Sequence, residues 1–325
     1  MVVVVRVPFF SPYRRHPRLL DARPRSLANA FASRCATMSL GILPDAALDE
    51  RAPSPSSSSR AWRRSALGYK EKFVDAFTFE RVTVRQFSSR AAFSKAMHRE
   101  CSPQTCDGDF DAVPETAFTV WDASILLGKY ASRADVWARL SQRAIAEERA
   151  CIALELGAGT GLASLILASS DACAKRGGVF ALTDLPDVVE FTKRNARENK
   201  SENGGRVPDA CVLAAAPMRW GRIDDVDALP PALRWPDVVL GADLMYTSNT
   251  DILRNLAEST TALMKPGSVG VFAACKEHRP EAIEKFVECM APSFDVQRVP
   301  ASTVHSEYPA NDSDFEILEF WRLSD

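Results

Sequence analysis

Blocks of hydrophobic residues recur along the second half of the chain, and longer segments with a mixed pattern separate them. The blocks predict five buried strands, at 152–156, 178–184, 210–215, 237–243 and 268–275. Between them, GLASLILASS, the segment from Pro186 to about Asn199, and NTDILRNLAESTTALM have the spacing and end signals of helices. Strands that alternate with helices favour a parallel sheet with helices on both faces.

Both ends of this pattern break the alternation. After a helix around 280–290, SFDVQRVP and FEILEFWRL are strand-like runs with only a loop between them, so we expect them to pair antiparallel. Upstream, FVDAFTFERVTVRQF alternates apolar and polar residues, as a half-buried hairpin does. A polar loop is expected at about 97–116, and then a helix in FTVWDASILLGKYASR, whose apolar positions form one buried face.

The first 66 residues differ from the rest in composition, because they are rich in arginine, poor in acids and include APSPSSSSR. Such a composition is typical of an organelle transit peptide and equally of a disordered leader, and Met38 offers a later start. We therefore expect a leader at 1–66 and one folded domain at 67–325, of which 67–116 is an extension with a β-hairpin. The expected location is the cytoplasm, or the mitochondrion or chloroplast if the leader is a transit peptide.

Composition mainly excludes certain partners and sites. The 325 residues are 46% hydrophobic, which is enough to bury a core, and the formal net charge is -2. A nearly neutral chain without a basic stripe argues against nucleic acid as a partner, and no apolar run approaches the roughly 18 residues of a membrane helix. The eight cysteines form no C-x-x-C pair, so neither a zinc site nor a disulfide framework is indicated.

The stretch CIALELGAGTG, at 151–161, places glycines at alternate positions directly after an apolar run. A strand, a glycine-rich turn and a helix put backbone N–H groups beneath a ligand at the carboxyl edge of a sheet. A dinucleotide motif requires G-x-G-x-x-G, but Leu162 stands at its third position, and the spacing here is G-x-G-x-G. The stretch therefore predicts close approach of something to this backbone, with a tight turn that binds no ligand as the alternative.

Asp184 ends the second predicted strand, where a carboxylate can accept hydrogen bonds from both hydroxyls of a ribose. The alternative is that it caps the helix that begins near Pro186. Of the two, we favour the ribose site.

Six features that occur in order along 67–325 carry a family resemblance: the tryptophan of VWDA, ELGAGTG, LTDLP, the Trp-Gly pair at 220–221, GADLMY and the closing hairpin. Together they resemble the seven-β-strand (class I) S-adenosylmethionine-dependent methyltransferases, specifically the D-x-x-Y family of non-histone protein-lysine methyltransferases. The resemblance implies a Rossmann-like α/β fold, with a parallel sheet that ends in an antiparallel hairpin, and S-adenosylmethionine as the cofactor.

The resemblance also implies a role for individual residues. The loop that contains Glu155, Gly157, Gly159 and Gly161 would hold the methionine part of the cofactor, and Asp184 the ribose. Trp220 would flank the adenine, Trp121 would pack over the cofactor from the N-terminal side, and Ala242 would face it from the edge of the fourth strand. For either tryptophan, packing in the core is the alternative.

Asp243 and Tyr246 follow the fourth strand, where open α/β sheets place their reactive groups. Methyltransferases that act on base or glutamine amide nitrogens usually carry two prolines between the acid or amide and the aromatic residue. This chain has Leu244 and Met245 there, which favours an amine over a planar nitrogen. We expect Asp243 to orient a lysine amine and Tyr246 to form a wall of the pocket for that amine. The alternatives are that Asp243 caps a helix and that Tyr246 packs in the core.

The sequence thus predicts a monomeric enzyme that methylates a lysine of a chaperone, an AAA ATPase or a translation factor, without nucleic acid or membrane as partners. The alternatives are methylation of a protein histidine or a small-molecule amine, or a catalytically inactive protein that binds the cofactor. His98, His278 and His305 are isolated, so no metal is predicted. In CKEHR, at 275–279, Glu277 or Arg279 would either touch substrate or lie in a solvated loop.

Overall fold

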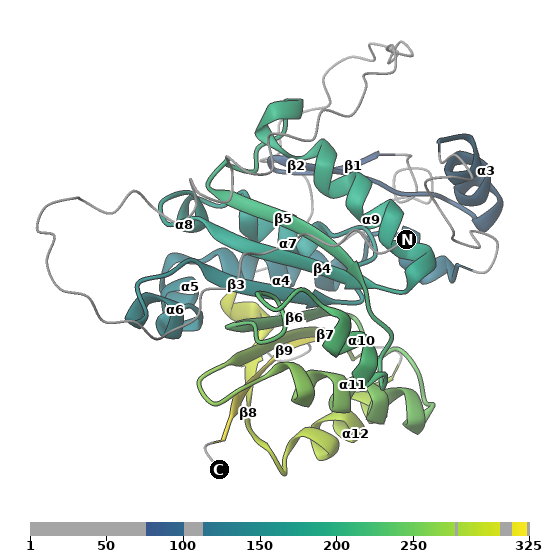
Figure 1. Cartoon of the computed structure of the whole chain (residues 1–325). Coiled ribbons are helices and arrows are strands. Elements are labelled where there is room, and N and C mark those ends of the chain that lie inside the picture. Colours follow the sequence, from purple (N-terminus) through teal and green to yellow (C-terminus); the bar gives the residue numbers. More distant parts are fainter. Residues whose placement is uncertain (1–75, 101–112, 277–278, 306–313, 324–325) are drawn as a thin grey trace, which may run out of the picture.

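A seven-stranded mixed sheet forms the centre of the molecule in the computed structural model, which describes residues 76–100, 113–276, 279–305 and 314–323 (Figure 1). Its strands are β3 (Cys151–Leu156), β4 (Gly178–Asp184), β5 (Cys211–Pro217), β6 (Val238–Ala242), β7 (Val269–Cys275), β8 (Phe294–Pro300) and β9 (Phe315–Arg322). Their order is β5-β4-β3-β6-β7-β9-β8; the pairs from β5 to β7 are parallel, and β9 is antiparallel to both β7 and β8. The predicted fold class, with its C-terminal antiparallel pair, is confirmed.

The central strands are apolar on both faces because helices cover both faces. All five residues of β6 are buried, whereas in the edge strand β8 only Phe294 is buried and the other residues are partly or fully exposed. Neighbouring residues in a strand point to opposite faces, so Ala153 belongs to one hydrophobic cluster and Leu154 to another. The sheet is therefore the partition between two separate apolar layers.

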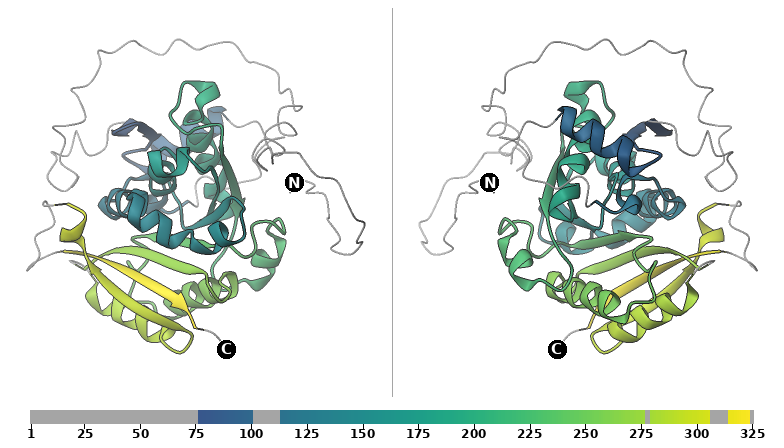
Figure 2. Two further views of the ribbon diagram at one scale, coloured as in Figure 1. Left: turned by 90° about the vertical axis from the view of Figure 1, so that its left-hand side faces the viewer. Right: turned by 90° about the vertical axis from the view of Figure 1, so that its right-hand side faces the viewer.

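Helices α4 (Asp122–Ser132), α7 (Leu162–Ala168) and α9 (Pro186–Glu198) lie on one face of the sheet, together with the shorter α5 (Ala134–Leu140), α6 (Gln142–Ala146) and α8 (Asp171–Ala174). The other face carries α10 (Ile223–Ala228), α11 (Thr250–Leu263) and α12 (Pro280–Met290) (Figure 2). Helices α7, α9, α11 and α12 agree with the predicted segments within one or two residues, whereas α4 begins four residues inside its predicted segment. The short ones were not predicted, because they contain too few turns to show a period.

The predicted hairpin is present as β1 (Ala76–Phe79) and β2 (Val82–Arg85). It is followed by a helix that the sequence did not reveal, α3 (Arg90–Glu100), and by the 3-10 turn η3 (Glu115–Phe118), both in or next to the expected loop. The predicted leader at 1–66 and the segment 101–112 lie outside the described residues. No helix in the described ranges is long and apolar enough to cross a membrane.

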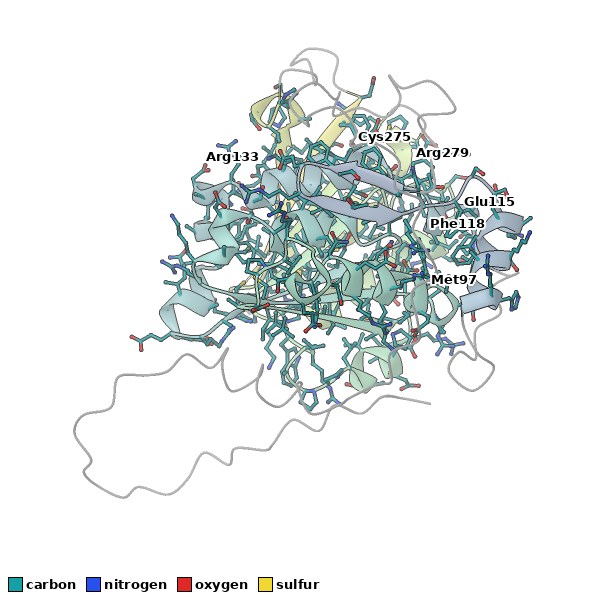
Figure 3. All side chains as sticks on the ribbon, turned by 90° about the horizontal axis from the view of Figure 1, so that it is seen from above. Met97, Glu115, Phe118, Arg133, Cys275 and Arg279 are labelled. Carbon is teal, nitrogen blue, oxygen red and sulfur yellow. The ribbon has the colours of Figure 1, made fainter. Side chains whose placement is uncertain are left out.

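An aromatic cluster attaches this N-terminal region to the sheet. Phe93 of α3 stacks on Phe118 of η3 with ring centroids 4.8 Å apart, and it meets Phe191 of α9 edge-on at 5.4 Å. Phe87, which follows β2, contacts the same three rings, and its N–H donates to the Phe118 carbonyl at 3.0 Å. In Figure 3, Phe118 lies on the same side of the molecule as Cys275, at the carboxyl end of β7. The N-terminal region is therefore fastened beside the carboxyl ends of the parallel strands.

Asp237, directly before β6, organises the opposite edge of the sheet. Its carboxylate is fully buried and accepts hydrogen bonds from Arg143 at 2.7 Å, from Arg149 at 2.6 and 2.7 Å, and from the Ile152 N–H at 2.9 Å. Burial alone would raise the pKa of Asp237, but the hydrogen bonds from Arg149, Ile152 and Arg143 outweigh it, so the pKa lies below its ordinary value. This carboxylate joins α6, β3 and β6.

We expect Asp237→Asn to lower the free energy of unfolding at pH 7 by about 3 kcal/mol, because it leaves two arginines beside a neutral amide. Since the folded-state pKa is depressed, the stabilisation is complete above the unfolded pKa of about 4 and disappears as the pH falls through the folded value. Urea denaturation of parent and variant at pH 7 and near pH 3 measures both effects. Asp135→Asn, in an exposed ion pair with Arg133, is the control and should change little. An equal loss in both variants would contradict the role of Asp237.

Candidate functional site

The glycine loop between β3 and α7 adopts a backbone that only glycine accepts readily. Gly157, Gly159 and Gly161 have φ of 55°, 51° and 79°. A Cβ at Gly159 would lie 2.7 Å from the Ala117 carbonyl oxygen, and one at Gly161 would lie 2.6 Å from Leu182. At Gly157 it would meet Leu244 at 2.8 Å and Trp220 at 3.1 Å. The predicted close approach is real, and at all three glycines the close neighbours are groups of the protein itself.

A cavity of about 620 Å³ opens above this loop, at the carboxyl ends of the parallel strands. Most of the residues predicted for the site line it: Trp121, Gly157, Gly159, Asp184, Trp220, Ala242, Asp243 and Tyr246. The structure thus brings together residues that are more than 120 positions apart in the sequence. Its volume lies within the range of small-molecule sites.

Asp184 lies in the floor of the cavity with both carboxylate oxygens engaged. One oxygen accepts from the Gly159 N–H and the other from the Leu185 N–H, each at 2.7 Å. Burial raises the pKa of Asp184 to about 6, although these two hydrogen bonds lower it. The following helix α9 begins at Pro186, with Leu185 as its capping position, so Asp184 is not the helix cap.

Glu155 and Gly161 lie behind the loop, apart from the cavity lining that the described residues form. The Glu155 carboxylate is 1% exposed and accepts from the Ser164 N–H of α7 at 3.0 Å. Burial raises its pKa to about 7. Gly161 forms the left-handed turn that starts α7. These two residues shape the loop from below and have no direct path to a ligand in the cavity.

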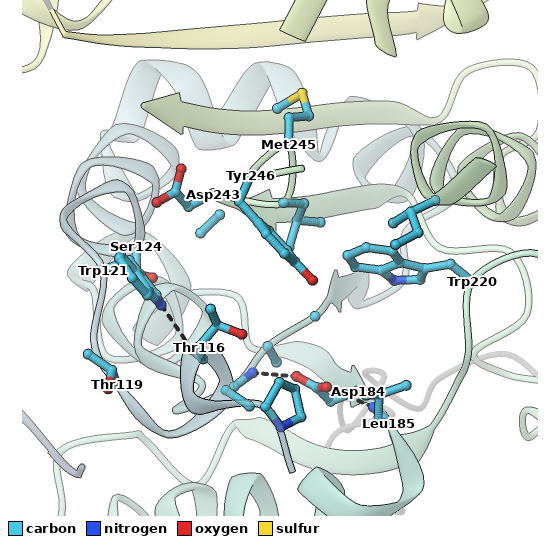
Figure 4. Close-up of a pocket in the computed structure, with 18 of the residues that line it drawn as sticks. Thr116, Thr119, Trp121, Ser124, Asp184, Leu185, Trp220, Asp243, Met245 and Tyr246 are labelled. Carbon is cyan, nitrogen blue, oxygen red and sulfur yellow. Dashed lines mark hydrogen bonds between the residues drawn. The ribbon is translucent and has the colours of Figure 1, made fainter. Parts of the chain in front are cut away.

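Three aromatic side chains surround the open space, as Figure 4 shows. Tyr246 points into its middle, Trp121 stands on one side and Trp220 on the other. Trp121 is 41% exposed and is held by a hydrogen bond from its Nε1 to the Thr116 carbonyl at 2.9 Å. Trp220 also packs against the core below it, and Tyr246 is 48% exposed. Trp121 and Tyr246 are therefore not core residues, whereas Trp220 serves both as core and as cavity wall.

Asp243 has a strained backbone at the end of β6. Its φ of 58° lies in the left-handed region, its N–H donates to the Ala273 carbonyl at 2.8 Å, and its carboxylate accepts from the Cys275 N–H at 3.2 Å. The next helix, α11, is capped by Asn249, so the alternative that Asp243 caps it is wrong. Two bonds to β7 thus fix the direction in which this carboxylate meets the cavity.

Several lining residues were not predicted from the sequence. Thr116, Ser124 and Met218 carry no motif, and their positions follow only from the packing of η3, α4 and β5 around the loop. Leu185 stands in LTDLP, but no role was predicted for it. Arg279 and Cys275, from CKEHR, also line the cavity, so Arg279 is placed where it could touch a substrate. Glu277 and His278 lie outside the described residues. Among the residues that the structure describes, no group of three histidines, cysteines or acids is placed to hold a metal ion.

We expect Gly159→Ala to destabilise the protein more than Gly204→Ala does. Both glycines have positive φ, which costs an alanine roughly 1 to 2 kcal/mol, but a Cβ at Gly204 would meet nothing within 4 Å, whereas one at Gly159 meets Ala117. Chemical denaturation of both variants separates the backbone cost from the collision. Equal losses would show that the Ala117 carbonyl does not confine the loop.

The chain is similar to proteins of one known family. A family model described as lysine methyltransferase matches residues 110–293, more than half of the chain. Protein N-lysine methyltransferase METTL21A of Mus musculus is 30% identical over 194 residues, which cover 58% of this chain and 75% of that protein. EEF1A lysine methyltransferase 3 of Mus musculus is 32% identical over 134 residues, 41% of this chain and 46% of that protein.

Among solved structures, a predicted O-methyltransferase from Agrobacterium tumefaciens is similar with a TM-score of 0.42 and 14% identity, covering 62% of this chain and 81% of that one. The family itself rests on the match of the family model over 110–293 and on the two mouse relatives. The resemblance inferred from the six motifs is thereby confirmed, and the chain belongs to the lysine methyltransferase family.

Proposed function

We propose that this protein transfers methyl groups from S-adenosylmethionine to a lysine side chain of another, non-histone protein. One observation carries the proposal: a single continuous cavity has the buried carboxylate of Asp184 in its floor and Asp243 and Tyr246 in another wall. A cofactor site and an acceptor site that share one cavity are what direct group transfer requires. The names of the two mouse relatives support a protein lysine as the acceptor.

The cavity fits S-adenosylmethionine by its volume and by the polar and aromatic groups that line it. Each Asp184 oxygen accepts one backbone N–H and has a further lone pair for a ribose hydroxyl. Leu185, Met218 and Trp220 provide an apolar and aromatic surface next to it, suited to adenine. Gly157 and Gly159 expose backbone where the methionine part would lie. When bound, S-adenosylmethionine supplies a reactive methyl group on a positively charged sulfur.

Asp243 and Tyr246 would receive the lysine amine. With a reference pKa near 10.4, only about one lysine in a thousand is neutral near pH 7.4, so the site must favour loss of the proton. A carboxylate opposes that loss, and we therefore assign Asp243 to orientation: its bonds to β7 hold it still, and its carboxylate would accept a hydrogen bond from the amine. The apolar faces of Trp121 and Tyr246 desolvate the amine and lower its pKa.

Tyr246 remains a neutral phenol in this site. Burial, and then the nearby charge of Asp184, raise the pKa of Tyr246 above its ordinary value. It therefore offers a wall and a hydroxyl donor, and it is no base. The proton of the lysine leaves to water, which reaches the site because the side chains of Trp121 and Tyr246 are partly exposed.

The substrate is tested directly by incubating the protein with radiolabelled S-adenosylmethionine and a cell lysate, followed by mass spectrometry of the labelled species. We propose a chaperone, an AAA ATPase or a translation factor as the target, with the label on lysine. Label on histidine, or in a small-molecule fraction, would overturn the proposed acceptor. Binding of the cofactor without transfer to any protein would instead indicate an inactive member of the family.

Cofactor affinity should fall about tenfold between pH 7 and pH 5. The pKa of Asp184 is about 6, so about one carboxylate in ten is ionised at pH 5, and the protonated form loses an acceptor for the ribose. Calorimetry with S-adenosylhomocysteine measures this slope, which Asp184→Asn should flatten. Glu155→Gln should keep the slope near pH 6, because Glu155 faces Ser164. A parent protein whose affinity is constant over this range would refute the ribose assignment.

Asp243→Asn should slow methyl transfer roughly a hundredfold, which corresponds to ~3 kcal/mol of lost positioning in the transition state. The substitution suits the site, because asparagine tolerates the left-handed φ of 58° and still accepts from the Cys275 N–H. Single-turnover methylation, calorimetric affinity and thermal unfolding are measured on the same preparation. Unchanged transfer would remove Asp243 from the chemistry, and a large loss of cofactor affinity would place it in the cofactor site.

A further inference from the structure

Helix α9 and its C-terminal capping residue, Asn199, carry three buried polar side chains on one face. Thr192 and Asn195 are 0% exposed and Asn199 is 3% exposed, and their spacing of three and four residues aligns them along the helix. Buried hydroxyl and amide groups are costly unless they are hydrogen-bonded. The partners of these three side chains therefore show what this face of α9 holds in place.

Two of the side chains complete the edge of the N-terminal hairpin. The Arg85 N–H donates to Asn195 Oδ1 at 2.9 Å, and Asn195 Nδ2 donates back to the Arg85 carbonyl at 3.3 Å. In the same way the Thr83 N–H donates to Asn199 Oδ1 at 3.2 Å, and Asn199 Nδ2 donates to the Thr83 carbonyl at 2.6 Å. A side-chain amide has the donor and acceptor of a peptide group, so the two asparagines occupy the place of a neighbouring strand beside β2.

The same face of α9 also holds the glycine loop. The Thr192 hydroxyl donates to the Gly159 carbonyl at 2.7 Å, and Asn195 Nδ2 donates to the Thr160 carbonyl at 3.0 Å. Asn199 instead donates to the Asn195 carbonyl at 2.8 Å. Asn195 is thus bonded to both the hairpin and the glycine loop, whereas Asn199 is bonded to the hairpin and not to the glycine loop.

Fixing a carbonyl also fixes the N–H of the same peptide plane. In a trans peptide the two groups point in opposite directions. The bond from Thr192 to the Gly159 carbonyl therefore aims the Thr160 N–H away from α9. The bond from Asn195 does the same for the Gly161 N–H, which donates to the Ala158 carbonyl at 2.6 Å. Gly159 and Thr160 both line the cavity, so α9 determines how this backbone faces a ligand.

We propose that Thr192 and Asn195 are positioning residues of the cofactor loop, and that Asn195 couples the N-terminal hairpin to it. The hairpin, which does not line the cavity, then supports cofactor binding through one amide side chain. This inference rests on the proposed function for the identity of the ligand. A loop released from α9 has to be ordered when the cofactor binds, so the affinity falls while the contacts to the cofactor stay the same.

The test compares Asn195→Ala with Asn199→Ala, two equal truncations on one helix that both remove bonds to β2. Calorimetry with S-adenosylhomocysteine should show an affinity about tenfold weaker for Asn195→Ala, or about 1.4 kcal/mol, and within about twofold of the parent for Asn199→Ala. Melting temperatures should fall similarly in both. In the protein without cofactor, hydrogen exchange of the Gly159 and Gly161 amides should accelerate in Asn195→Ala and stay as in the parent in Asn199→Ala.

Thr192→Val and Thr192→Ser decide the matter if Asn195→Ala does not fold. Valine keeps the shape and loses the hydroxyl, so it should weaken binding, whereas serine keeps the donor and should restore the parent affinity. Equal weakening by Asn195→Ala and Asn199→Ala would reduce the hairpin to a general stabiliser and overturn the coupling. Valine and serine variants that both bind like the parent would overturn the positioning role. A parent protein that binds no S-adenosylhomocysteine would refute the proposed function, and hydrogen exchange would still decide the inference.

Discussion

The close contact between the glycine loop and the Ala117 carbonyl is the constraint on which the site depends. It is possible only because Gly159 has a positive φ and no Cβ. In this position the Gly159 N–H reaches Asp184, and the ends of β3 and β4 become parts of one surface. The N-terminal segment closes over that surface through η3 and supplies Trp121 directly after it. A larger residue at position 159 would therefore disturb three elements at once.

Two aspartates in the same cavity are prepared for different tasks by their backbone partners. Asp184 is nine-tenths buried and accepts two N–H groups from its own loop region, so it is a fixed acceptor in the floor. Asp243 stands at a left-handed corner, is partly exposed and is tied to the neighbouring strand β7, near Tyr246. The two residues have the same side chain, but Asp184 is more deeply buried than Asp243, so the two carboxylates lie in different environments. The pair suits a site that binds one molecule deeply and a second one at its mouth.

The sequence predicted the sheet and much of the cavity, because both depend on local signals. The strand at 178–184 was predicted with its observed bounds, since an apolar run between a glycine and an aspartate leaves little freedom. The burial of Glu155 behind the glycine loop was not predictable. The sequence of β3 indicates which face of the sheet a residue takes, but it does not show which residues pack on that face. Thr192, Asn195 and Asn199 are likewise indistinguishable in sequence from a solvated helix face. Their partners are β2 and the glycine loop, and only the folded chain places these beside α9.

The position of β9 between β7 and β8 has a consequence for the order of folding during synthesis. Gly270 of β7 lies against the ring of Phe320 of β9 with no room for a side chain, and Phe320 contacts Phe272 and Phe294 as well. Until Phe315–Arg322 has left the ribosome, β7 presents an unpaired edge and a gap in its apolar layer. Nascent chains that stall or stop upstream of this strand are therefore exposed to aggregation and to chaperone capture, although all the described residues that line the cavity have already been synthesised.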